Sequence, residues 1–265
     1  MQNINPIFIL QPVIVITLCS LLMVYWYRKH RFHGMIWLYT LIAYGGAIAA
    51  KYALQLPTIG LVIGSGEAAL GLYYGVQTVV FEVGFAYLVA YLAFKRGSLD
   101  RRDAEAFGSG LGFWENVGFL SALSLVNLIA YYAILSGGSS LATTLYEQLS
   151  TNAPSLFASD VEALGLVGIG VLERISSLLV HVAWGYLCVM AVIYRKKALF
   201  AIALPMGLID FLVPFASANV LVFEVAFFAL AVVCIIVAWY ATKRLIKQPK
   251  TSQTMQSIPT QQLLS

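Results

Sequence analysis

The feature that most constrains this chain is a series of seven apolar runs, each long enough to cross a lipid bilayer as a helix. A membrane-spanning helix needs about 20 predominantly apolar residues. The sixth run is the shortest and contains Pro205 and Pro214, so we expect a kink or a break there. The sequence therefore predicts an all-α polytopic membrane protein, a bundle of about seven transmembrane helices in one domain over residues 1–247. The runs occupy residues 7–27, 35–56, 69–94, 105–135, 163–193, 198–216 and 219–242.

The composition agrees with a chain that lies in a membrane. Hydrophobic residues make up 60% of it and charged residues only 11%, whereas roughly 25% of the residues of a soluble domain are charged. All but two of the 16 basic residues fall outside the apolar runs, so the net charge of +4 does not indicate a nucleic-acid surface. We therefore expect a multi-pass protein of the cell membrane, with the lipid bilayer and no nucleic acid as partner. The polar segment 248–265 is predicted to be a disordered cytoplasmic tail.

Positive charges alternate between successive loops. They follow the first, third, fifth and seventh runs, at residues 28–31, 95–102, 195–197 and 243–250. The N-terminal segment and the loops after the second, fourth and sixth runs contain no Lys or Arg. Because positive charge is retained on the cytoplasmic side, this pattern predicts an outside N-terminus, a cytoplasmic C-terminus and an odd number of spans.

The longest outer loop, residues 136–162, carries only acidic charge. Its Leu141, Leu145 and Leu149 repeat at a helical spacing. The loop is therefore expected to be either a short interfacial helix or a solvated connection.

Eight ionisable residues lie inside the predicted spans, where the hydrocarbon disfavours them. Each costs about 2.5–3.5 kcal/mol on insertion scales, so such residues persist where they pair, line a wet cavity or perform chemistry. Function should therefore be sought at these positions. They are Lys51, Glu82, Glu115, Glu173, Arg174, His181, Asp210 and, nearer the outer surface, Glu224.

The fifth run contains the densest group of these residues. Arg174 and His181 are seven residues apart, close to two helical turns, so both project from one stripe with Ser177 between them. Glu173 lies about 12 Å from His181 along the axis, too far for direct contact. The adjacent Glu173 and Arg174 are either a structural ion pair between helices or part of a site. His181 is either a hydrogen-bonded core imidazole or a functional one.

Two further acids, Glu82 and Glu115, lie well inside the third and fourth runs. An unpaired carboxylate is disfavoured there, so each is predicted to be a general base or proton carrier, or else a partner of Lys51 or Arg174. Gly108 and Gly112 form a G-x-x-x-G step before Glu115, which allows close approach of another helix.

The order and spacing of these residues resemble the YhfC family of intramembrane proteases, which is similar to the group of CAAX-processing and bacteriocin-processing proteases. The resemblance spans roughly residues 70–215. It rests on the acid of FEVGF (Glu82), the glycine helix GSGLGFWE (Gly110, Gly112, Glu115), Glu-Arg followed by His (Glu173, Arg174, His181) and the acid of MGLID (Asp210).

Carried over residue by residue, the resemblance implies catalytic roles for Glu82, Glu115 and His181 in a buried polar chamber. Glu173, Arg174 and Asp210 would line the same chamber, and Asn116 could donate to an oxyanion. The substrate implied is a membrane-embedded or membrane-adjacent peptide segment, hydrolysed by a water that a carboxylate activates.

The chain departs from the family pattern at several motif positions. Leu111 and Met206 stand where family histidines are expected, and Phe81 and Phe85 replace an acid and an arginine. A catalytic zinc needs about three protein ligands, and His181 is the only histidine in a predicted span. The residues thus leave open a zinc-dependent mechanism, a metal-free glutamic mechanism and peptide binding without cleavage.

Two functions of other classes also fit the sequence. Buried carboxylates with a histidine and an arginine suit the proton relay of a proton-coupled transporter or channel. Seven helices with an outside N-terminus also suit a receptor, although the membrane part of the seventh run contains no Lys for a retinal Schiff base.

Overall fold

The computed structural model describes residues 3–217 and 219–246, and within them it shows helices and no strand. Seven helical segments in this part are long and apolar enough to cross a membrane. The predicted all-α bundle of seven spans is therefore confirmed, whereas its orientation stays a prediction. The predicted disordered tail, 248–265, lies outside the described residues. The seven segments are Pro6–His30, Ile36–Ser65, Glu67–Lys95, Arg101–Ser136, Asp160–Ile193, Lys197–Ala216 and Val220–Ile246.

Most spans are α-helical, but several contain segments with a different helical winding. The α-helices are α1 (Leu10–His30), α2 (Ile36–Val62), α3 (Glu67–Gln77), α4 (Gly84–Lys95), α5 (Ala104–Phe113), α6 (Ala122–Ser136), α7 (Ser140–Asn152), α8 (Asp160–Ile193), α9 (Lys197–Ala203) and α10 (Val220–Ile246). The other segments are the 3₁₀ turns η1 (Pro6–Ile9), η2 (Ile63–Ser65), η4 (Arg101–Asp103), η6 (Pro154–Phe157) and η7 (Leu204–Ser217), and the π-helical η3 (Thr78–Val83) and η5 (Trp114–Ser121).

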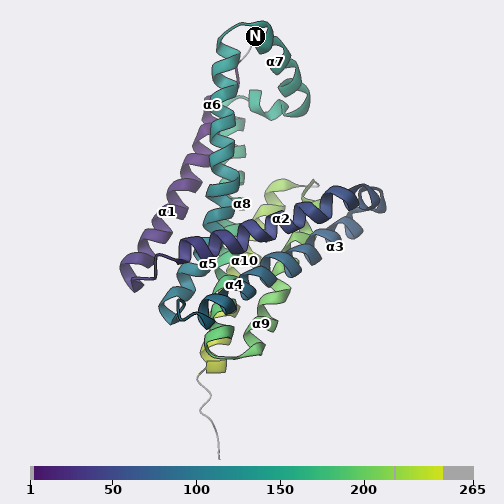
Figure 1. Cartoon of the computed structure of the whole chain (residues 1–265). Coiled ribbons are helices and arrows are strands. Elements are labelled where there is room, and N and C mark those ends of the chain that lie inside the picture. The colour runs from purple at the N-terminus through teal and green to yellow at the C-terminus, as the bar shows by residue number, and fades with distance from the viewer. Residues whose placement is uncertain (1–2, 218, 247–265) are drawn as a thin grey trace, which may run out of the picture.

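Helix α8 lies at the centre of the bundle. It is 34 residues long and begins after Ser159, whose side chain accepts a hydrogen bond from the Glu162 N–H. It packs against α1, α4, α5, α9 and α10. Figure 1 shows α8 behind α6, with α2 and α3 crossing at a steep angle to both. Trp184 and Leu187 of α8 are buried in the main apolar core. Since this helix carries Arg174 and His181, its burial places these two side chains inside the protein rather than against lipid, whereas the Glu173 side chain is 42% exposed.

Small residues bring α5 unusually close to α8. A Cβ added to Gly108 would lie 2.5 Å from the carbonyl oxygen of Val182, and one added to Gly185 would lie 2.5 Å from the Cα of Gly108. At Gly112 an added Cβ would lie 3.2 Å from the Cβ of His181. The helix that approaches the glycine step is therefore α8, and this close contact fixes the position of His181 relative to α5.

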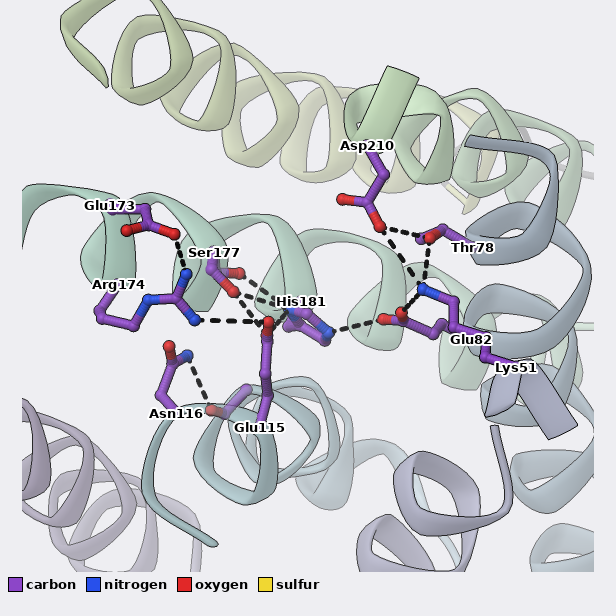
Figure 2. Close-up of polar contacts among 11 residues, drawn as sticks. Lys51, Thr78, Glu82, Glu115, Asn116, Glu173, Arg174, Ser177, His181 and Asp210 are labelled. Atoms are coloured by element: carbon purple, nitrogen blue, oxygen red, sulfur yellow. Dashed lines mark hydrogen bonds and ion pairs between the residues drawn. The ribbon is translucent and has the colours of Figure 1, made fainter. Parts of the chain in front are cut away.

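The third and fourth spans each switch from α-helix to π-helix at the residues predicted to matter. Glu82 lies in η3 and Glu115 in η5. A π-helical stretch changes the direction of the side chains that follow it, and such stretches occur frequently at functional sites. Both carboxylates are directed toward α8 from these segments (Figure 2).

The sixth span is not a continuous α-helix, in agreement with the expected break. Helix α9 ends at Ala203, and the chain continues as the 3₁₀ segment η7, which contains Pro205 and Pro214. Because proline has no N–H to donate, it disfavours continuation of the α-helical ladder. Segment η7 packs tightly on α3, where a Cβ added to Gly71 would lie 2.3 Å from the carbonyl oxygen of Phe211. This packing brings Asp210 beside η3.

The loop predicted to lie outside contains a helix, as one of the two alternatives expected, and the interfacial position of that helix stays a prediction. Helix α7 begins after Ser139, whose side chain accepts a hydrogen bond from the Ala142 N–H. Its Leu149 is buried in a second apolar cluster with Ile4, Phe8 and Leu135. This cluster ties the N-terminal segment to the α6–α7 end of the bundle.

Candidate functional site

A cavity of about 330 Å³ lies between α8, η7 and α10, with η3 and η5 closing its sides. We call this cavity the chamber. Apolar side chains, among them Trp184, Ile209 and Phe227, form the rest of its wall. The chamber is lined by all six residues that the sequence predicted for it: Glu82, Glu115, Glu173, Arg174, His181 and Asp210.

His181 lies between the two predicted catalytic carboxylates (Figure 2). Its Nε2 is 3.1 Å from Oε2 of Glu82, and its Nδ1 is 3.1 Å from Oε2 of Glu115 and 2.9 Å from the Ser177 carbonyl oxygen. Both ring nitrogens thus face acceptors, which a doubly protonated imidazolium satisfies best. Only 4% of His181 is exposed, and its ring packs against Trp184 and Tyr44.

On one side of His181, Glu82 is held by Lys51 of α2. The Lys51 ammonium bonds Glu82 Oε1, donates to Thr78 Oγ1 at 2.6 Å, and lies 3.5 Å from Oδ2 of Asp210. The Thr78 hydroxyl in turn donates to Asp210. Glu82 therefore has the lysine partner that one of its two interpretations predicted, and it also contacts the histidine.

On the other side of His181, Glu115 is held by groups from α8. The Ser177 hydroxyl donates to Glu115 at 2.5 Å, and Nη1 of Arg174 lies 3.7 Å from Glu115 Oε1. Nη2 of Arg174 pairs with Glu173. Nη1 is buried and has no hydrogen-bond partner among the described residues. Arg174 lines the chamber, and its Nη1 pairs with Glu115 by charge without a hydrogen bond.

These contacts form a continuous polar chain in which acids and cations alternate, so that each carboxylate faces at least one positive group. Opposite charges that contact each other lose less free energy in a medium of low dielectric than isolated charges do. This polar chain explains how a bundle with so few charged residues retains a cluster of them in its interior. In order, it comprises Asp210, Lys51, Glu82, His181, Glu115, Arg174 and Glu173.

Asn116 lies outside this arrangement. It is fully buried, its amide nitrogen donates to the Gly112 carbonyl at 2.9 Å, and its side chain is not part of the chamber lining. At the chamber wall the available donor is Nη1 of Arg174 instead. The structure therefore brings together six of the seven predicted site residues and separates Asn116 from them.

Four residues of the site were not among those predicted for it. Lys51 and Glu224 had been noted only as charges within spans, and Thr78 and Ser177 are short polar residues in apolar helices. Thr78 precedes Glu82, and Ser177 precedes His181, by four residues, the spacing at which side chains meet on one helix face. That spacing was the available signal. Glu224 lines the chamber, is 5% exposed, and its Oε2 has no hydrogen-bond partner in the described part of the chain.

The donor set of the chamber does not fit a catalytic metal. Such a site needs about three ligand atoms directed at one point, whereas the two nitrogens of His181 face different carboxylates. Those carboxylates are also bonded to a lysine or lie beside an arginine. Leu111 and Met206, at the expected histidine positions, are buried in the apolar core and do not line the chamber.

One group of ligand-type side chains does converge in the described residues, but it lies elsewhere. Its members are His33, Asp100 and Asp103, whose ligand atoms lie within 4.8 Å of one another. Asp103 already accepts hydrogen bonds from the backbone and ring of His33 and from the Asp100 N–H. Arg102 contacts both His33 and Asp100. This group anchors two loops to each other.

Comparison with known protein families matches residues 14–237 to the family described as YhfC intramembrane metalloprotease. The match covers most of the chain and extends beyond the segment 70–215 on which the resemblance rests. No curated protein and no solved structure matches the chain.

Proposed function

Since this chain belongs to the YhfC intramembrane metalloprotease family, we propose that it hydrolyses a peptide bond of a membrane-embedded or membrane-adjacent segment that enters the chamber. The observation that carries the proposal is the meeting of Glu115, His181 and Arg174 at the wall of one cavity, where Nη1 of Arg174 makes no hydrogen bond to the described residues. Together they supply an acceptor for a proton, a donor of a proton and a donor for an oxyanion.

Glu115 is the better candidate for the general base. Lys51 neutralises Glu82, whereas Glu115 has a hydroxyl and a histidine as its nearest donors and the arginine at 3.7 Å. In the proposed step Glu115 accepts a proton from water while the hydroxyl oxygen bonds to the scissile carbonyl carbon. The negative charge that develops on the carbonyl oxygen is stabilised by Nη1 of Arg174.

His181 then completes the reaction. Its ring donates a proton to the leaving amine as the C–N bond breaks, and the proton held by Glu115 restores the imidazolium. Glu82 contacts Nε2, so it orients the ring and stabilises its positive charge. In this scheme Glu115 and His181 are the catalytic residues, Glu82 positions His181, and Asp210 and Lys51 position Glu82.

The test is an assay of the purified full chain in lipid nanodiscs against a library of transmembrane peptides. We expect the wild type to cleave and Glu115→Gln and His181→Ala to cleave about 100-fold more slowly, which is the loss in rate expected when a general acid or base is removed. Glu147→Gln on the exposed face of α7 is the matched control and should cleave like the wild type. Equal cleavage by the wild type and all three variants would refute catalysis in the chamber. Retention of peptides without any cleavage would favour the binding-only alternative.

A proton-coupled transporter or channel is the second candidate, because the polar chain from Asp210 to Glu173 could also relay protons. Proton uptake into proteoliposomes that disappears in Glu82→Gln would favour it over hydrolysis. The family match favours the peptidase.

A further inference from the structure

The position between Glu82 and Asp210 is filled by a side chain of the protein itself. Three oxygen-bearing groups, Glu82, Asp210 and Thr78, surround the Lys51 ammonium. The Lys51 side chain is 13% exposed and that of Glu82 is 8% exposed, so the contact is largely shielded from water. Carboxylate and hydroxyl oxygens are ligands that hard divalent cations take. In this chain the same oxygens solvate an ammonium.

Glu115 and His181, the ligand-type side chains of the chamber that adjoin Glu82, are already engaged by protein groups. Glu115 is occupied by Ser177, His181 and the nearby Arg174. Nε2 of His181 contacts Glu82, and Nδ1 contacts Glu115 and the Ser177 carbonyl, so neither nitrogen is left for a ligand bond. A divalent ion between Glu82 and Asp210 would have to displace Lys51, and one between Glu115 and Glu173 would have to displace Arg174.

We propose that the Lys51 ammonium is the resident cation between Glu82 and Asp210 and that this member of a metalloprotease family holds no divalent metal at that position. Lys51 stabilises the negative charge of Glu82 and Asp210, which a metal ion would otherwise do. The inference concerns the ions in the chamber, so it holds whether or not the chain hydrolyses peptides.

Removal of the Lys51 charge should open the position between Glu82 and Asp210 to a metal ion. The Lys51→Met variant keeps the length of the side chain and removes its charge. Glu82, Asp210 and Thr78 are then left around an empty position, with His181 adjacent to Glu82. We therefore expect Lys51→Met to gain affinity for Zn²⁺ and Mn²⁺ that the wild type lacks.

The experiment measures metal content and metal-dependent stability of the full chain in nanodiscs. Protein is incubated with Zn²⁺ or Mn²⁺ and dialysed, and bound metal is determined by elemental analysis. Thermal midpoints are recorded with each ion and with a chelator. We expect wild type and Lys51→Arg to retain no stoichiometric metal and to show no shift, and Lys51→Met to bind metal and to unfold at a higher temperature with it.

A second variant assigns the gained metal to this position. Lys51→Met combined with Asp210→Asn lacks one of the two carboxylates, so it should lose most of the gained metal. Metal retained equally by both variants would place the ion elsewhere and contradict the proposal. If Lys51→Met does not fold, the metal content of the wild type tests the proposal alone. Stoichiometric metal that is present in the wild type and absent from Glu82→Gln would overturn the proposal. Because these readouts are metal content and stability, their outcome is independent of peptide cleavage.

Discussion

At the scale of single residues, the chamber combines charges that are individually unfavourable in a bilayer. Lys51 contacts two carboxylates and a hydroxyl, so its removal leaves Glu82 and Asp210 facing each other without a counter-charge. Loss of one partner from a buried pair is far more costly than the net contribution of the intact pair. The residues around His181 are therefore expected to be sensitive to substitution in proportion to the contacts they lose.

The Lys51→Met variant should accordingly be less stable without metal. We expect its free energy of unfolding to fall by about 3 kcal/mol, the size seen when one partner of a buried ion pair is removed. Denaturant titration in mixed micelles measures it. Lys196→Met, at an exposed position after α8, is the control and should change stability little. Equal stability of Lys51→Met and the wild type would contradict the buried pairing.

Arg174 offers a test of the oxyanion assignment. Its Nη1 pairs with Glu115 at 3.7 Å without a hydrogen bond, whereas the Asn116 amide donates to the Gly112 carbonyl. Arg174→Gln should lower kcat by about 100-fold or more with a smaller effect on KM, as for removal of an oxyanion donor. Asn116→Ala should leave kcat within a few-fold of the wild type. Steady-state kinetics on a cleaved peptide separate the two, and the reverse ranking would restore Asn116 to the site.

At the scale of elements, winding and close packing direct the side chains. The π-helical η3 and η5 carry Glu82 and Glu115, and the 3₁₀ segment η7 carries Asp210. All three acids thus lie in segments that depart from α-helical geometry, while Arg174 and His181 lie in the regular α8. The departures let acids from three spans reach one face of a straight central helix.

The contact between α5 and α8 should tolerate no added side chain. Because a Cβ at Gly108 would meet backbone atoms of Val182, Gly108→Ala must move α5 away from α8. We expect a loss of about 1–3 kcal/mol, as for overpacked cores. Gly165→Ala is the matched control on α8, since nothing lies within 4 Å of its added Cβ. Denaturant titration compares them, and an unaffected Gly108→Ala would contradict the close packing.

At the scale of the whole molecule, the third to seventh spans line the chamber, and the loops between spans carry the charge pattern that sets the orientation. The charge pattern predicts that α7 lies outside and the loop after α8 lies in the cytoplasm. The native cysteines Cys19, Cys188 and Cys234 are buried, so they should give little background labelling.

Cysteines introduced at two exposed positions test this orientation. Glu147→Cys, in α7, should react with a membrane-impermeant maleimide on intact cells. Lys196→Cys, after α8, should react only once the membrane is permeabilised. Labelling in the opposite order would reverse the predicted topology.

The sequence by itself determined the solvent, the helical class, the seven spans and the set of residues that violate the apolar pattern. These follow from it because hydropathy and charge are local properties that need no knowledge of packing. Six of the seven predicted site residues line the chamber, because charged residues buried in a membrane bundle are retained where they pair with one another.

Only the tertiary structure decided which charge faces which. It directs Lys51 to Glu82 and Asp210, gives His181 a carboxylate on each nitrogen, and turns Asn116 away from the chamber. Adjacent residues of an α-helix differ in direction by about 100°, so the π-helical and 3₁₀ segments decide which side chains reach the cavity. The prolines of η7 predict its break locally, but its packing on α3, which places Asp210 beside η3, joins distant spans and is specified by no local pattern.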